Sequence, residues 1–113
     1  MKSHNWDTLK CSDVLRNLYA YHTQNGTEYH RGIAYGMEQT LTIYGIHIRG
    51  INAHNKAVVT AHLRNKRMSA DERAQALSGE AYENIYEKDI TESEYWTGVY
   101  DGVEQTLAML GKN

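Results

Sequence analysis

An internal repeat constrains the fold of this chain more than any other feature of its sequence. Residues 28–45 read EYHRGIAYGMEQTLTIYG, and residues 94–111 read EYWTGVYDGVEQTLAMLG. On a helix, the apolar and small residues that the two copies share recur at i, i+3, i+4, i+7 and i+8 and form one continuous face. Each copy therefore predicts an amphipathic helix. Each predicted helix ends at a glycine, Gly45 or Gly111, which suits the left-handed residue after a helix.

Four glycines lie inside these predicted helices, two in each copy and four residues apart: Gly32, Gly36, Gly98 and Gly102. A glycine inside a helix costs about 1 kcal/mol relative to alanine. Its use on the apolar stripe therefore indicates that another backbone comes very close. The simplest interpretation is that the two repeat helices cross each other around a pseudo-two-fold axis within one chain. The alternative is that the glycines form the seam of a homodimer.

Cap residues divide the rest of the chain into further helices. A helix of about residues 70–89 has its apolar side at Ala74, Leu77, Ala81 and Ile85. The pair Asn25-Gly26 ends the helix that precedes the first copy. A pattern of helical spacing from about residue 55 predicts a middle helix, after a brief extended piece near Ile46 and Ile48. The predicted N-caps are Ser12, Thr27, Ser69, and either Thr91 in a capping box with Glu94 or Ser93.

The expected fold is all-α. We predict a single domain, residues 1–113, built from two related helical hairpins at about 12–45 and 70–111. The basic segment 46–69, with the middle helix, joins them, and the hairpins form a pseudo-two-fold helical bundle. The chain contains no proline, which suits long helices.

Several function classes find no support in the sequence. No apolar run reaches the roughly 18 residues of a membrane span, and the N-terminus lacks the apolar region of a signal peptide, so we expect a cytoplasmic protein. One cysteine, Cys11, cannot form a disulfide within the chain. Neither the spacing of the histidines nor any glycine loop predicts a metal or phosphate site. We therefore expect a non-enzymatic protein with no metal and no cofactor.

Charge is unevenly distributed along the chain. Residues 49–67 carry five basic residues and no acid, whereas residues 68–113 carry three basic and ten acidic residues. A basic helix can lie against a nucleic-acid backbone, which defines one candidate function, a nucleic-acid-binding regulator. The alternative is that this segment docks on acidic protein surface, in its own chain or in a second copy. The candidate nucleic-acid contacts are Arg49, Lys56, Arg64, Lys66 and Arg67.

Acidic residues gather on one side of the predicted helix that follows Ser69. Glu72, Glu80, Glu83 and Glu87 fall within about 80° of arc at about 100° per residue, and Asp89 follows them. Carboxylates at this spacing can imitate a phosphate backbone and occupy a basic groove on a partner protein. The alternative is a solvated helix face. We interpret the Glu-Gln pairs shared by the two copies, at 38–39 and 104–105, as solvated too, with Glu38 facing solvent.

The stretch EYWTGVYDGVEQTLAMLG resembles a helix that is common in small accessory proteins of Gram-positive phages and prophages. The resemblance rests on a Tyr-x-x-Gly-x-x-x-Gly segment, present at residues 29–36 and 95–102, followed by a Thr-Leu pair. It implies an origin in a mobile element. Such proteins often inhibit or redirect a host machine by stoichiometric binding, and CRISPR nucleases are among their targets. The resemblance thus implies an inhibitor that binds a host protein.

Overall fold

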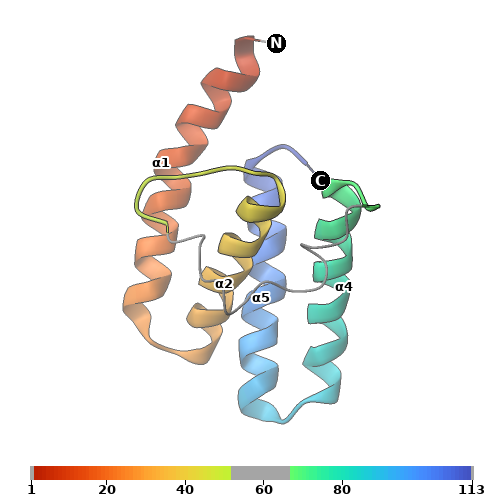
Figure 1. Cartoon of the computed structure of the whole chain (residues 1–113). Coiled ribbons are helices and arrows are strands. Elements are labelled where there is room, and N and C mark those ends of the chain that lie inside the picture. Colours follow the sequence, from red (N-terminus) through yellow and green to blue (C-terminus); the bar gives the residue numbers. More distant parts are fainter. Residues whose placement is uncertain (1, 52–66, 113) are drawn as a thin grey trace.

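The computed structural model describes residues 2–51 and 67–112. Within these ranges lie the helices α1 (Lys2–Asn25), α2 (Glu28–Ile43), α4 (Ala70–Glu87) and α5 (Ile90–Met109), and no strand. The all-α prediction is confirmed. Helices α2 and α5 form the middle of the bundle, with α1 packed on one side and α4 on the other (Figure 1). The predicted middle helix lies outside the described residues.

The first helix begins earlier than predicted. We expected an N-cap at Ser12, but α1 starts at Lys2 and runs to Asn25. No glycine or proline interrupts this range. Asp13, expected in the first turn, lies inside the helix and pairs with Arg16 one turn later at 3.0 Å. In Figure 1 the N-terminal part of α1 extends beyond the rest of the bundle.

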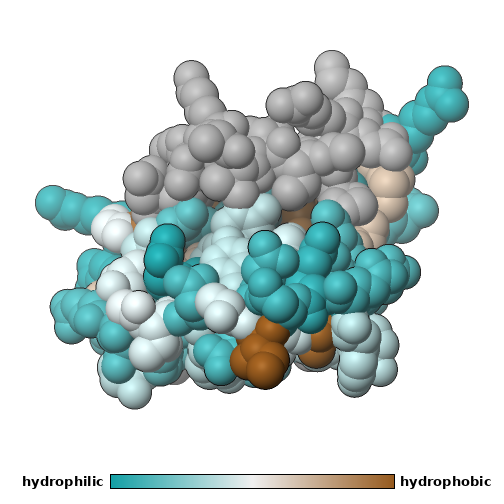
Figure 2. All heavy atoms as spheres, turned by 90° about the horizontal axis from the view of Figure 1, so that it is seen from below, coloured by the Kyte–Doolittle hydropathy of each residue, from teal (hydrophilic) through white to brown (hydrophobic). Residues whose placement is uncertain are grey.

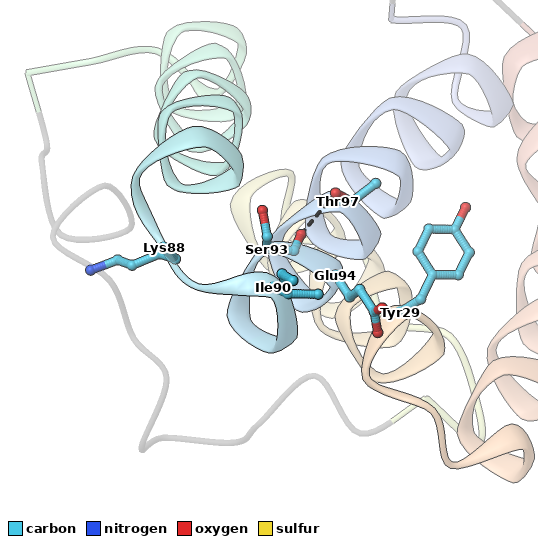
Figure 3. A pocket seen from close by; sticks show the side chains of 6 residues that line it. All are labelled: Tyr29, Lys88, Ile90, Ser93, Glu94 and Thr97. Carbon is cyan, nitrogen blue, oxygen red and sulfur yellow. Dashed lines mark hydrogen bonds between the residues drawn. The ribbon is translucent and has the colours of Figure 1, made fainter.

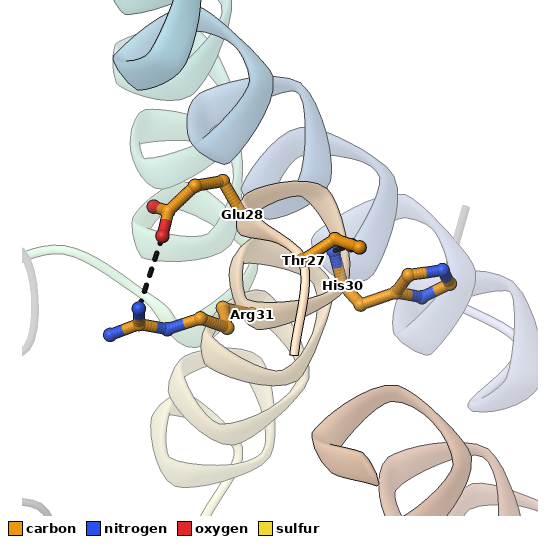
Figure 4. A network of polar contacts seen from close by, with 4 residues as sticks. All are labelled: Thr27, Glu28, His30 and Arg31. Atoms are coloured by element: carbon orange, nitrogen blue, oxygen red, sulfur yellow. Dashed lines mark hydrogen bonds and ion pairs between the residues drawn. The ribbon is translucent and has the colours of Figure 1, made fainter. Parts of the chain in front are cut away.

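Two of the predicted N-caps are confirmed. The Thr27 hydroxyl accepts a hydrogen bond from the backbone N of His30 at 3.2 Å, at the start of α2 (Figure 4). Ser69 begins α4 with a reciprocal capping box. Its Oγ accepts from the backbone N of Glu72 at 3.1 Å, and Glu72 Oε1 accepts from the backbone N of Ser69 at 3.0 Å. These bonds satisfy backbone groups that would otherwise lack partners in the first turn.

The predicted caps of the last helix, Thr91 and Ser93, are wrong. Asp89 caps α5, and its Oδ1 accepts a hydrogen bond from the backbone N of Glu92 at 3.0 Å. An Asp is at least as good a cap as Thr or Ser, and it occurs earlier in the chain. Ser93 instead lies inside α5, where its hydroxyl donates a hydrogen bond to the carbonyl oxygen of Ile85 in α4.

The four glycines of the repeat lie where α2 and α5 cross: Gly32, Gly36, Gly98 and Gly102. A Cβ on Gly32 would lie 2.9 Å from the backbone N of Val99, and a Cβ on Gly98 would lie 2.9 Å from the backbone N of Ile33. Added Cβ atoms at the other two positions would also meet backbone atoms of the opposite helix. The backbones of α2 and α5 therefore touch directly, because no side chain stands between them.

The core flanks this crossing on both sides. One cluster joins α4 to the central pair and includes Ala74, Leu77, Ala81, Val99, Val103 and Leu107. The other joins α1 to the central pair and includes Leu15, Ile33, Met37 and Leu41. Ile48 and Ile51, which follow α2, are buried in the second cluster. Residues 46–48, where we expected a brief extended piece, form no strand.

Candidate functional site

The outer side of α4 carries exposed aromatic and acidic side chains on one helix face. Ala74, Leu77 and Ala81 bury the opposite side of this helix in the core. Over residues 79–87, this outer side consists of five residues that fall within about 140° of arc at about 100° per residue. We call it the α4 face, and it comprises Gly79, Tyr82, Glu83, Tyr86 and Glu87.

Two tyrosines dominate the α4 face. Tyr82 is 52% exposed and Tyr86 is 72% exposed. Their ring centroids lie 5.2 Å apart, and the centroid of a third ring, Tyr100 of α5, lies 6.0 Å from that of Tyr82. A hydrogen bond to Tyr82 raises the pKa of Tyr86 above its ordinary value, so the Tyr86 phenol stays neutral at physiological pH. Amphipathic rings exposed in this way are enriched at protein interfaces.

Glu83 and Glu87 lie beside these rings, and both are exposed. They bring two of the five predicted acidic residues onto the α4 face. A surface that combines aromatic rings with carboxylates suits a partner that presents arginine or lysine, because the rings attract cations and the carboxylates pair with them.

The other three predicted acidic residues have different surroundings. Glu72 belongs to the capping box of α4, and its hydrogen bonds with Ser69 lower its pKa. Asp89 is the N-cap of α5. Glu80 is half-buried at the edge of α4, where its charge contributes to the raised pKa of Tyr35 in α2, after the larger effect of burial.

A surface groove adjoins the C-terminal end of α4. It has a volume of about 430 Å³, and its lining comes from the turn after α4, from one side of α5 and from the start of α2 (Figure 3). Ile90, at the start of α5, is 81% exposed. The surrounding end of the bundle is mostly hydrophilic (Figure 2). The lining residues are Tyr29, Lys88, Ile90, Ser93, Glu94 and Thr97.

The basic segment is described only at its two ends. Arg49 and Arg67 are both exposed. Lys56, Arg64 and Lys66, the remaining candidates for nucleic-acid contact, lie outside the described residues.

The tyrosines of the α4 face were missed in the sequence, where charge alone selected the candidate residues. A signal was present. Tyr82 and Tyr86 are four residues apart and lie off the apolar stripe of Ala74, Leu77 and Ala81, so the periodicity of the helix predicts that they face outward. Gly79, inside the same helix and also off the stripe, was a second signal.

Comparison with known proteins gives no relative from which a function could be transferred. No protein-family model matches the chain, and no curated protein and no solved structure shows significant similarity to it. In the described ranges, no helix combines the length and hydrophobicity that crossing a bilayer requires. Over the same residues, no three His, Cys, Asp or Glu side chains are grouped so that they could hold a metal ion.

Proposed function

We propose that this chain is a non-enzymatic binding protein whose α4 face contacts a basic surface of a host protein. The observation that carries the proposal is the pair of exposed rings, Tyr82 and Tyr86, next to the exposed carboxylates of Glu83 and Glu87. Interfaces depend on a few aromatic anchors surrounded by polar contacts, and tyrosine is one of the residues most enriched among them. Complementary charge adds specificity and speeds association.

Gly79 supports the same surface. It lies inside α4, where glycine costs about 1 kcal/mol relative to alanine. The four glycines at the crossing of α2 and α5 are explained by contacts within the chain, because backbone atoms of the opposite helix occupy the space that a Cβ would need. An added Cβ on Gly79 would meet nothing within 4 Å. A partner backbone that comes close to the α4 face would give this glycine the same role as the other four.

The class of partner follows from the chemistry of the face and from the resemblance to phage accessory proteins. Carboxylates can take the positions of phosphates in a basic groove, and exposed rings can take the positions of stacked bases. We propose a cytoplasmic host machine that binds nucleic acid, such as a CRISPR nuclease, as the target of inhibition. The protein would then act as an inhibitor encoded by a mobile element.

We further propose that the two hairpins, α1–α2 and α4–α5, are copies of one unit related by a pseudo-two-fold axis. The reciprocal contacts of Gly32 and Gly98 support this relationship. So do two equivalent hydrogen bonds of 2.7 Å, from Thr40 Oγ1 to the oxygen of Gly36 and from Thr106 Oγ1 to that of Gly102. If the proposal is right, duplication supplied a rigid scaffold, and later divergence of α4 supplied the binding face.

Charge reversal on the α4 face tests the proposal. We expect the Glu83→Lys/Glu87→Lys variant to capture at least about tenfold less of its partner from bacterial lysate. Two carboxylates that attract a basic groove are replaced by two ammonium groups that repel it. Its helicity and melting temperature should match those of the wild type, since both positions are exposed. Mass spectrometry after nuclease treatment identifies the partner.

A control variant, Asp13→Lys/Glu92→Lys, makes the same change of charge at exposed positions of α1 and α5. It should capture the partner as the wild type does. Equal capture by the α4-face variant would contradict the proposal. Retained material that disappears on nuclease treatment would favour the nucleic-acid-binding alternative, in which Arg49 and Arg67 contact a backbone.

A further inference from the structure

A second concave surface lies on the outer side of α2, between α1 and α5. It has a volume of about 270 Å³, smaller than the pockets that hold drug-sized ligands and comparable with one large side chain. None of its lining residues belongs to the α4 face. We call it the tyrosine pocket, and its polar lining consists of Tyr19, Thr23, Arg31, Tyr35, Glu38 and Tyr95.

Glu38 supplies the negative charge of the tyrosine pocket. It was expected to face solvent, but it is half-buried, because α1 packs beside it. The Tyr19 hydroxyl donates a hydrogen bond to Glu38 Oε1. Burial raises the pKa of Glu38, and this hydrogen bond opposes part of that effect. A carboxylate offers about four acceptor positions, so Glu38 can accept further hydrogen bonds from a ligand.

Two further tyrosines form the wall opposite α1. The rings of Tyr35 and Tyr95 have centroids 6.0 Å apart and are tilted by 38°. Burial is the main cause that raises the pKa of both phenols, and the charge of Glu38 adds to it in each case. Both therefore stay neutral, and their rings are the kind of surface on which cations stack.

The pocket contains one cation of its own, Arg31, which forms an ion pair. Its Nη1 lies 3.0 Å from Glu28 Oε1 (Figure 4). Glu28 and Glu38 both act to raise the pKa of Tyr95, and Arg31 acts to lower it. Glu80 also acts on Tyr35, so the side-chain charges that act on these two phenols are three carboxylates and the Arg31 guanidinium. The local charge favours a cationic ligand.

We propose that the tyrosine pocket receives the guanidinium group of an arginine side chain from a protein partner. The planar guanidinium stacks on tyrosine rings and pairs with a carboxylate through two parallel hydrogen bonds, for which Glu38 has the acceptors. An ammonium group would use the carboxylate but would lose the stacking. The inference does not depend on the α4 face, because the pocket uses other residues on other helices.

Backbone amide NMR of the full chain, titrated with N-acetyl-arginine amide, tests this inference. We expect saturable shifts at Tyr35, Glu38 and Tyr95, with a dissociation constant on the order of 1 mM for so small a probe. The citrulline analogue, which has the same shape without the charge, should cause no saturable shift. Shifts that appear equally with citrulline, or no shifts at these residues with either probe, would overturn the inference.

A matched pair of variants sharpens the test. Glu38→Gln should weaken binding by at least about tenfold, because hydrogen bonds to a charged group are lost. Glu104→Gln changes the counterpart of Glu38 in the second repeat copy, which accepts a hydrogen bond from Ser78 at 3.0 Å, and should leave binding unchanged. Unweakened binding by Glu38→Gln that remains folded by circular dichroism would contradict the role of Glu38. Saturable shifts of the same residues by acetate instead would show that Arg31 selects an anion.

Discussion

At the residue scale, two histidines form a distinctive contact between α1 and α2. His22 Nδ1 lies 2.8 Å from His30 Nδ1, and the rings stack with centroids 5.0 Å apart. The rings of Tyr21 and Tyr29 pack edge-on against His30. His22 is 6% exposed, and its burial, followed by the charge of His30, lowers its pKa below the ordinary 6.5. One proton between the two Nδ1 atoms holds the pair together, and a proton on both would break it.

The histidine pair predicts that stability falls on mild acidification. The folded-state pKa of His22 lies below its unfolded value, so the unfolded chain binds more protons as the pH drops through about 6.5. The free energy of unfolding should therefore be lower at about pH 5.5 than at about pH 7.5. Urea unfolding at the two pH values measures the difference. His22→Gln should reduce this difference in the free energy of unfolding between the two pH values. An unchanged difference in His22→Gln would contradict this role.

Two glycines predict opposite effects of the same substitution. Gly98→Ala places a Cβ against the backbone of α2, so we expect a loss of about 1–3 kcal/mol in the free energy of unfolding, and Gly98→Leu should lose more. Gly79→Ala adds a Cβ in open space on a helix, so we expect a gain of about 0.5–1 kcal/mol. Urea denaturation measures both. A neutral Gly98→Ala would mean that α2 and α5 do not cross at this position.

At the element scale, helix ends show what a sequence can and cannot predict. Thr27 follows the break at Asn25-Gly26, and Ser69 precedes an acidic first turn with Glu72 three residues later, so sequence alone predicts both caps. Ser12 was predicted wrongly, because a Ser-Asp pair can also lie inside a helix when nothing upstream stops it. At α5, several candidate caps occur within five residues of one another, and sequence alone cannot decide which hydroxyl or carboxylate reaches a free amide.

The cap of α5 gives a test that distinguishes the structure from the sequence-based expectation. Asp89→Ala removes the acceptor of the Glu92 amide, so we expect a loss of about 1 kcal/mol in the free energy of unfolding. Thr91→Ala, at the position first expected to be the cap, should change it by less than about 0.5 kcal/mol, because this side chain is exposed. Thermal or urea unfolding measures both. The reverse order would contradict Asp89 as the cap.

At the scale of the whole molecule, the internal repeat predicts which residues pack between the helices. It predicts less well which polar residues are exposed. Six positions are buried in both copies: Gly32, Ile33, Gly36, Met37, Thr40 and Leu41 in the first, and Gly98, Val99, Gly102, Val103, Thr106 and Leu107 in the second. The shared Glu-Gln pair behaves less uniformly, because Glu38 and Glu104 are both half-buried but the glutamines differ. Gln39 is buried, whereas its counterpart Gln105 is exposed. Packing follows from periodicity within one helix, but the surroundings of a polar side chain depend on which neighbouring helix covers it, and that is known only in three dimensions.

We propose that the α4 face meets a protein partner, and site-specific photo-crosslinking can capture that contact in the cell. The residue p-benzoylphenylalanine would replace Tyr86 in one sample and Tyr21 of α1, which is 56% exposed, in another. Both positions carry an exposed ring in the wild type, so the label perturbs each in a similar way. After irradiation in bacterial cells, we predict that the label at position 86 forms a covalent adduct with one host protein and the label at position 21 does not. An adduct from position 21 alone, or none from position 86, would contradict the account.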